Sequence, residues 1–120
     1  MLNAAGLKGI RPRLRIGLVV STNEPELAWN AFRDGVKAIE NKHSVKVFLL
    51  GRGVECEDIS DTKFAVKQMM RDFVNKGGEI MTCGTCLKIR KKGSTELCPV
   101  STMQDLVDLT AESDRVLTFG

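Results

Sequence analysis

The chain has no tyrosine, one tryptophan and one histidine among its 120 residues. Proteins that stack on nucleic-acid bases interleave aromatic and basic side chains, and the five phenylalanines and the net charge of +3 do not form that pattern. No apolar run approaches the roughly 20 residues that a membrane-spanning helix requires. The sequence therefore argues against direct nucleic-acid binding and against a membrane span.

Size and composition place the chain among ordinary globular proteins. With 42% apolar and 28% charged residues, 120 residues are enough to bury one core without crosslinks. Residues 1–12 contain basic but no acidic side chains and lead straight into an apolar strand, so we expect a flexible N-terminal extension over 1–12 and a single domain over 13–120. Because no secretory leader is readable, we expect a cytoplasmic protein whose four cysteines stay reduced and serve chemistry.

Hydrophobic patterning predicts alternating strands and helices. Asn23 and Ser101 are the expected N-caps of the first and third long helices. Helix-length crossovers between strands imply a mostly parallel sheet covered on both faces, so the fold class is α/β. The expected strands are 13–20, 44–51, a segment ending at about residue 82 and the closing DRVLTFG, and the expected helices are 24–41, 61–76 and one from about residue 102.

The cysteines follow this predicted topology. In an open parallel sheet, active groups gather beyond the carboxyl ends of the strands. Cys83 comes directly after the third strand, Cys56 lies in the loop that leaves the second, and Cys98 precedes the third long helix. We therefore expect all three, together with Cys86, on one edge of the sheet.

The segment MTCGTCLKIRKKG, residues 81–93, carries the main chemical signal. A short helix beginning near Cys86, with basic residues along it, favours a thiolate at Cys83 or Cys86. The alternative is a pair of small core thiols beside a solvated basic turn. The basic residues in question are Lys88, Arg90, Lys91 and Lys92.

Two other functions share the Cys-x-x-Cys pattern and stay open as alternatives. A structural zinc site usually needs two such pairs, whereas here only Cys98, Cys56 and His43 remain, so we expect no bound metal. A thiol-disulfide exchanger carries its pair after an early strand, commonly with Trp in front, whereas this pair follows the third strand.

The glycines of GRGVEC, residues 51–56, begin like a dinucleotide-binding fingerprint. The third glycine position is Cys56, and no helix opens directly after Gly53, so we expect no cofactor. Gly51 and Gly53 are expected to turn the chain sharply out of the second strand. The single His43, in the polar turn ENKHSV, has no evident partner for a Ser–His–Asp arrangement.

From RIGLVVSTNEPELAWNAFRDGVKAI to ESDRVLTFG the chain resembles the DsrE/DsrF-like family of small sulfur-relay proteins. The most specific segments are EIMTCGTC and STMQDLVDLTAESDRVLTF, and the Cys-x-x-Cys resembles the YchN-like branch. The resemblance implies a flavodoxin-like three-layer α/β/α fold, a homo-oligomer (trimer or hexamer), and donor and acceptor proteins as partners.

The resemblance also implies a cysteine that receives and passes sulfane sulfur as a persulfide. The sulfur-carrying position falls on Cys83 and the second cysteine of the branch on Cys86. Either residue stays open as the carrier, and the implied activity is that of a sulfurtransferase or of a carrier without turnover of its own. One departure from the family pattern is that RKKG delays the glycine that closes the short helix to Gly93.

Overall fold

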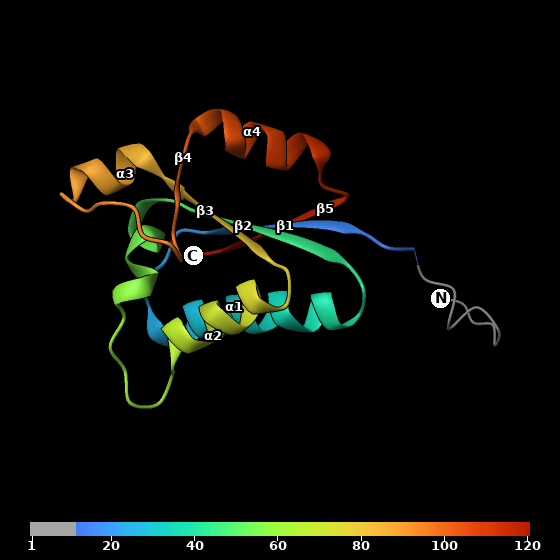
Figure 1. The fold of residues 1–120 in the computed structure, drawn as a ribbon, viewed down its shortest axis with the longest axis horizontal. Coiled ribbons are helices and arrows are strands. Elements are labelled where there is room, and N and C mark those ends of the chain that lie inside the picture. Colours follow the sequence, from blue (N-terminus) through green and yellow to red (C-terminus); the bar gives the residue numbers. More distant parts are fainter. Residues whose placement is uncertain (1–11) are drawn as a thin grey trace.

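The computed structural model describes residues 12–120, so the expected extension over 1–12 lies almost wholly outside the described part. The elements of the described part alternate as the patterning predicts (Figure 1). In chain order they are β1 (Arg15–Val20), α1 (Pro25–Glu40), β2 (Ser44–Leu49), the 3₁₀-helix η2 (Gly51–Asp58), α2 (Val66–Asn75), β3 (Glu79–Cys83), α3 (Gly84–Ile89), β4 (Val100–Ser101), α4 (Met103–Glu112) and β5 (Arg115–Phe119).

The five strands form one parallel sheet in the order β4-β3-β2-β1-β5. Helices α1 and α2 cover one face and α4 lies over the other, while α3 sits beyond the end of β3 (Figure 1). The predicted α/β class and its three layers are therefore confirmed. Because every strand is parallel, the carboxyl ends of β1, β2 and β3 meet at a single edge.

The two faces of the sheet are covered unequally. Against α1 and α2 the core is aromatic, and the rings of Phe32 and Phe73 meet edge to face at 5.7 Å between centroids. On the other face α4 buries only Leu109, which packs so closely over Gly17 that a Cβ there would collide with it. Much of α4 and β5 therefore stays exposed.

The observed N-caps of two helices differ from the predicted N-caps by one residue each. Helix α1 is capped by Glu24 and not by Asn23, since the Glu24 carboxylate accepts the N–H groups of Glu26 and Leu27. Helix α4 is capped by Thr102, in a capping box with Asp105. The expected cap Ser101 belongs to the short strand β4.

The segment between β2 and α2 also differs from the prediction. Residues 51–58 form η2 where a loop was expected, and α2 begins at Val66 and not near residue 61. The Asp61 carboxylate accepts the N–H groups of Lys63 and Phe64 in a local turn that holds this stretch out of the helix.

Candidate active site

Cys83 ends β3 and is also the N-cap of α3. Its Sγ accepts the backbone N–H of Cys86 at 3.4 Å, so this sulfur caps the first turn of α3. Opposite Cys83 in register is Ser101 of β4. The next residue must be small, because a Cβ at Gly84 would stand 2.9 Å from Val100. The fold thus holds Cys83 at the carboxyl edge, between β4 and α3.

Cys83 lines a cavity of about 540 Å³ together with residues of α3, of β4 and of the start of α4. Figure 1 shows the position of these three elements. We call this cavity the Cys83 cavity. Its lining combines two amines, four hydroxyls and an apolar wall and includes no acidic side chain. The lining residues are Cys83, Gly84, Thr85, Leu87, Lys88, Lys92, Ser94, Val100, Ser101, Thr102 and Met103.

Cys86 is half-buried, and its sulfur also contacts the start of η2. Its Sγ accepts the backbone N–H of Gly51 at 3.2 Å, and it does not line the Cys83 cavity. Gly51 has a φ of +56°, so the expected sharp turn out of β2 does require glycine. Burial is the main reason why the pKa of the Cys86 thiol is raised. The two sulfurs of the motif therefore have different surroundings.

The basic segment after the cysteines is partly neutralised by η2. Arg90 pairs with Glu55 at 2.6 Å, and Lys92 pairs with Asp58. The hydrogen bond from Arg90 is the main reason why the pKa of Glu55 is lowered. Within residues 12–120, Lys88 and Lys91 have no acidic partner. Of these two, Lys88 lines the Cys83 cavity.

The two ion pairs also fasten α3 to η2. The Arg90 Nη1 donates to the backbone carbonyl of Cys86 at 3.2 Å while its Nε binds Glu55, and Glu55 in turn accepts from Asn23. The loops after β1, β2 and β3 are thereby linked side by side at one edge. The acidic residues of η2 lie next to the candidate site, and they were not predicted from the sequence. The sequence feature that could have indicated them is the opposite charge of ECED at 55–58 and RKK at 90–92.

Cys56 and Cys98 lie in the core. The Cys56 thiol donates to the Thr22 carbonyl at 3.3 Å, and the Cys98 thiol lies beside Glu57 and Thr82. Burial raises the pKa of each thiol to about 12, helped by the neighbouring Cys98 for Cys56 and by the Glu57 charge for Cys98. The thiolate, which is the reactive form, is therefore suppressed at both positions.

We expect iodoacetamide at pH 8 to leave Cys56 and Cys98 unmodified in the folded protein and to modify both in denaturant. Peptide mass mapping after a timed reaction measures this. Since the pKa of both thiols is raised from 9.0, the folded chain retains protons that the unfolded chain releases above about pH 9. The contribution of these two thiols to the free energy of unfolding should thus be level below pH 9 and fall as the pH rises towards 12. Rapid labelling of Cys56 in the native protein would contradict the buried assignment.

The metal-binding alternative gains no geometric support from the described residues. Among residues 12–120, no three His, Cys, Asp or Glu side chains are arranged to hold a metal ion. His43 lies at the amino end of the sheet, where its Nδ1 accepts the backbone N–H of Leu14 at 2.9 Å. It is therefore remote from the cysteines at the carboxyl edge.

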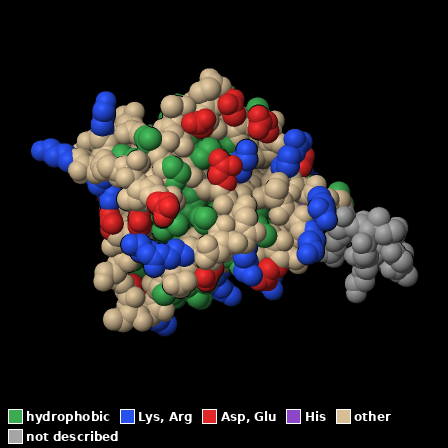
Figure 2. Space-filling model, in the orientation of Figure 1, with side chains coloured by type: hydrophobic (Ala, Val, Ile, Leu, Met, Phe, Trp, Pro, Cys, Tyr) green, Lys and Arg blue, Asp and Glu red, His purple; other side chains and the backbone are tan. Residues whose placement is uncertain are grey.

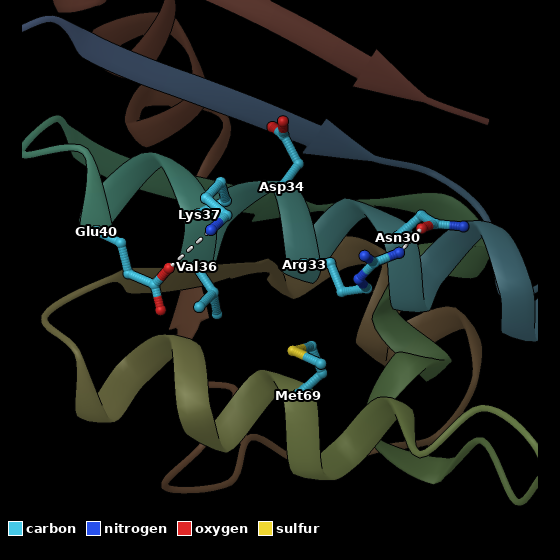
Figure 3. A pocket seen from close by; sticks show the side chains of 7 residues that line it. All are labelled: Asn30, Arg33, Asp34, Val36, Lys37, Glu40 and Met69. Carbon is cyan, nitrogen blue, oxygen red and sulfur yellow. Dashed lines mark hydrogen bonds and ion pairs between the residues drawn. The ribbon is translucent and has the colours of Figure 1, made fainter.

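A second hollow, of about 400 Å³, lies on the outer side of α1 and α2 (Figure 3). Its charged side chains have both signs, and Lys37 and Glu40 pair with each other across 3.3 Å. Burial raises the pKa of Asp34, which also lines it. This hollow contains no cysteine, whereas the Cys83 cavity does.

Comparison with known proteins identifies the family and agrees with the fold. The DsrE/DsrF-like family matches residues 14–119, so the chain belongs to that family. The uncharacterized protein MJ0989 of Methanocaldococcus jannaschii is 29% identical over 110 residues, covering 84% of this chain and 96% of that protein. The uncharacterized protein MK0008 of Methanopyrus kandleri is 30% identical over 100 residues, covering 78% of this chain and 83% of its own.

A solved structure supports the fold alone. The conserved protein of unknown function BT1422 from Bacteroides thetaiotaomicron superposes with a TM-score of 0.72 at 15% identity, covering 87% of this chain and 93% of that chain. Across residues 12–120, none of the helices has the length and apolar character needed to cross a membrane.

Proposed function

We propose that this protein accepts sulfane sulfur on Cys83 as a persulfide and passes it on to an acceptor. The observation that carries the proposal is the position of Cys83, which opens from the end of β3 into a cavity with two lysines and no acid. Membership of a family associated with sulfur relay supports the same reading. The Cys-x-x-Cys favours the YchN-like branch.

The transfer consists of two thiolate attacks. The Cys83 thiolate attacks the terminal sulfur of a donor persulfide, R–S–SH, so that a new S–S bond forms at Cys83 and R–S⁻ leaves. The departing thiolate takes up the proton of the new persulfide, which gives Cys83–S–S⁻ and R–SH. An acceptor thiol then attacks the terminal sulfur as its thiolate and releases the Cys83 thiolate. Lys88 and Lys92 line the cavity in which both attacks take place.

Cys86 is proposed as the helper of Cys83. If its thiolate attacks the inner sulfur of the persulfide, a Cys83–Cys86 disulfide forms and the terminal sulfur leaves as HS⁻. If it attacks the outer sulfur, it becomes the carrier itself. The Cys86 Sγ accepts the N–H of Gly51. Cys83, which lines the cavity while Cys86 does not, is proposed as the first acceptor.

Intact-mass spectrometry after incubation with a persulfide donor tests the proposal. A sulfur carrier gains the mass of one sulfur atom, and the gain is removed by a reductant. A thiol-disulfide exchanger instead cycles between dithiol and disulfide without holding extra sulfur. A metal-binding module would carry stoichiometric zinc or an iron–sulfur cluster, which elemental analysis detects. With purified donor and acceptor, multiple turnover would indicate a sulfurtransferase and a single loading a carrier.

We also expect the chain to assemble with copies of itself, as a trimer or hexamer. Large apolar side chains are exposed on α4 and on the edge strand β5, including Val107 at 54% and Leu117 at 46%. Figure 2 shows apolar side chains gathered near the middle of one face among charged ones. Assembly would cover such side chains. Sedimentation at micromolar concentration should give a multiple of 13.2 kDa, and a single-chain mass would contradict the expectation.

The remaining partners follow from the same proposal. A relay requires a sulfur donor and an acceptor; members of the family typically pass sulfur between proteins, and the acceptor is proposed to be a protein here. A cytoplasmic location fits because reduced thiols are needed to begin each cycle.

A further inference from the structure

We propose that the sulfur donor is a small anionic molecule that enters the Cys83 cavity, and not a cysteine on the surface of a folded partner. This inference rests on the proposed function of Cys83 and concerns the chemical identity of the sulfur donor. The shared chemistry of the donor is a terminal sulfane sulfur and a negatively charged group within one small molecule.

Access to the sulfur is the first reason. Cys83 is only 4% exposed, and it is reached through a cavity of about 540 Å³. That volume lies within the range of about 300–1,000 Å³ typical of small-ligand sites. A cysteine of a folded partner would have to approach Cys83 together with the protein surface that carries it. A small molecule fits inside it.

Charge is the second reason. The Cys83 cavity contains the amines of Lys88 and Lys92 and the hydroxyls of Thr85, Ser94 and Ser101, with no acidic residue in its lining. Lys92 is partly neutralised by Asp58, whereas Lys88 has no acidic partner within residues 12–120. Amine and hydroxyl donors converging on one space favour an anion over a neutral or cationic ligand.

The contrast with the neighbouring cavities strengthens this reason. The hollow on α1 and α2 contains Asp34 and Glu40 in its lining besides Arg33 and Lys37. The cavity on the η2 side of Lys92, about 630 Å³ in volume, contains Glu55 and Asp58 besides Arg90. Of these three cavities, only the Cys83 cavity has basic side chains and no acidic side chain in its lining.

The apolar wall indicates the rest of the donor. Leu87, Val100 and Met103 line the Cys83 cavity opposite its polar groups, and Val100 and Met103 are more than half exposed. A carbon chain between the anionic group and the persulfide would lie on this wall. An organic persulfide with a carboxylate therefore uses more of the cavity than inorganic thiosulfate, although both have the shared chemistry.

Sulfur transfer balances for both sources. With an organic persulfide, Cys83–S⁻ and R–S–SH give Cys83–S–S⁻ and R–SH. With thiosulfate, Cys83–S⁻ attacks the outer sulfur of S–SO₃²⁻, and the S–S bond of thiosulfate breaks to give Cys83–S–S⁻ and sulfite. Neither transfer needs a further oxidant or reductant.

The experiment compares matched donors by the rate of sulfur gain at Cys83, followed by intact mass. The probes are the persulfide of N-acetylcysteine, the persulfide of its uncharged methyl ester, thiosulfate, and a folded protein persulfidated on a surface cysteine. We expect the carboxylate donor to load Cys83 about tenfold faster than the ester, as expected for one charge-assisted hydrogen bond.

The matched variants are Lys88→Gln and Lys91→Gln, because Lys91 follows the same helix but lies outside the cavity lining. Lys88→Gln should remove most of the tenfold preference while leaving loading by the ester within about twofold, and Lys88→Arg should restore it. Lys91→Gln should leave both rates unchanged. The same dependence on Lys88 with thiosulfate would identify an inorganic source.

The outcomes separate this inference from the proposed function. Equal loading by acid and ester, or loading by the persulfidated protein alone, would overturn the small-anion donor while Cys83 stays a sulfur carrier. Equal loss of rate with both small donors in Lys88→Gln would show a structural effect and would also overturn the inference. If no donor adds sulfur to Cys83, the proposed function itself is wrong.

Discussion

Replacing Cys83 with serine is expected to abolish the gain of one sulfur atom from a persulfide donor. The hydroxyl keeps the shape of the site and accepts the Cys86 N–H, but a serine forms no persulfide. Since sulfur is carried covalently, the loss should be complete and not merely a slower rate. Intact-mass spectrometry of the native chain and of Cys83→Ser, under identical loading, measures it.

Serine replacements at the other three cysteines serve as matched controls. Cys56→Ser and Cys98→Ser should still gain sulfur if they fold, because the raised pKa of each of these thiols keeps it protonated in the native chain. Cys86→Ser should gain sulfur and retain it longer, since the disulfide that releases HS⁻ is no longer formed.

Two results would revise this assignment in different ways. Sulfur gain that survives Cys83→Ser and disappears in Cys86→Ser would transfer the carrier role to Cys86 and leave the function in place. No gain in the native chain, together with a readily reduced Cys83–Cys86 disulfide, would replace sulfur relay by thiol-disulfide exchange.

Gly53→Ala is expected to lower the free energy of unfolding by about 3 kcal/mol. A Cβ at Gly53 would collide with the backbone carbonyl of Val20, at the end of β1. That carbonyl also accepts the N–H of Leu50, so neither backbone can withdraw without breaking the start of η2. Because the obstacle is backbone and not a flexible side chain, little relief is available. Urea denaturation followed by circular dichroism measures the change.

Gly93→Ala is the matched control for this prediction. No atom lies within 4 Å of a Cβ built there, so the same substitution should change stability by less than about 0.5 kcal/mol. Equal stability of the two variants would contradict the described packing of η2 on β1. A displaced η2 should also disturb Cys86, because the N–H of Gly51 would no longer reach its Sγ.

The sequence by itself determined the layers of the fold and the first residue of the site. Apolar periodicity is a local property, and helix-length crossovers leave a parallel sheet as the natural arrangement. Because Cys83 follows a strand directly, its place at the carboxyl edge follows from the sheet, and β3 does end at this residue. The expected turn at Gly51 rests on the same local reasoning and agrees with its positive φ.

Only the tertiary structure decided what surrounds the cysteines. The sequence shows the basic segment but not that Glu55 and Asp58, more than thirty residues away, neutralise Arg90 and Lys92. Such pairs depend on how two loops meet, and no local pattern specifies that meeting. Strand β4 was missed because two residues are too few to show a period, yet it forms part of the wall of the Cys83 cavity.

The same limit applies to the two thiols of the motif. Cys83 and Cys86 are three residues apart and therefore lie within one helical turn. Their surroundings differ because Cys83 faces β4 and the start of α4, whereas Cys86 contacts η2. Burial and neighbouring charges shift the pKa of a thiol, and both are properties of the assembled fold. The chain order thus puts the two cysteines close together, and the packing of distant loops gives each sulfur its surroundings.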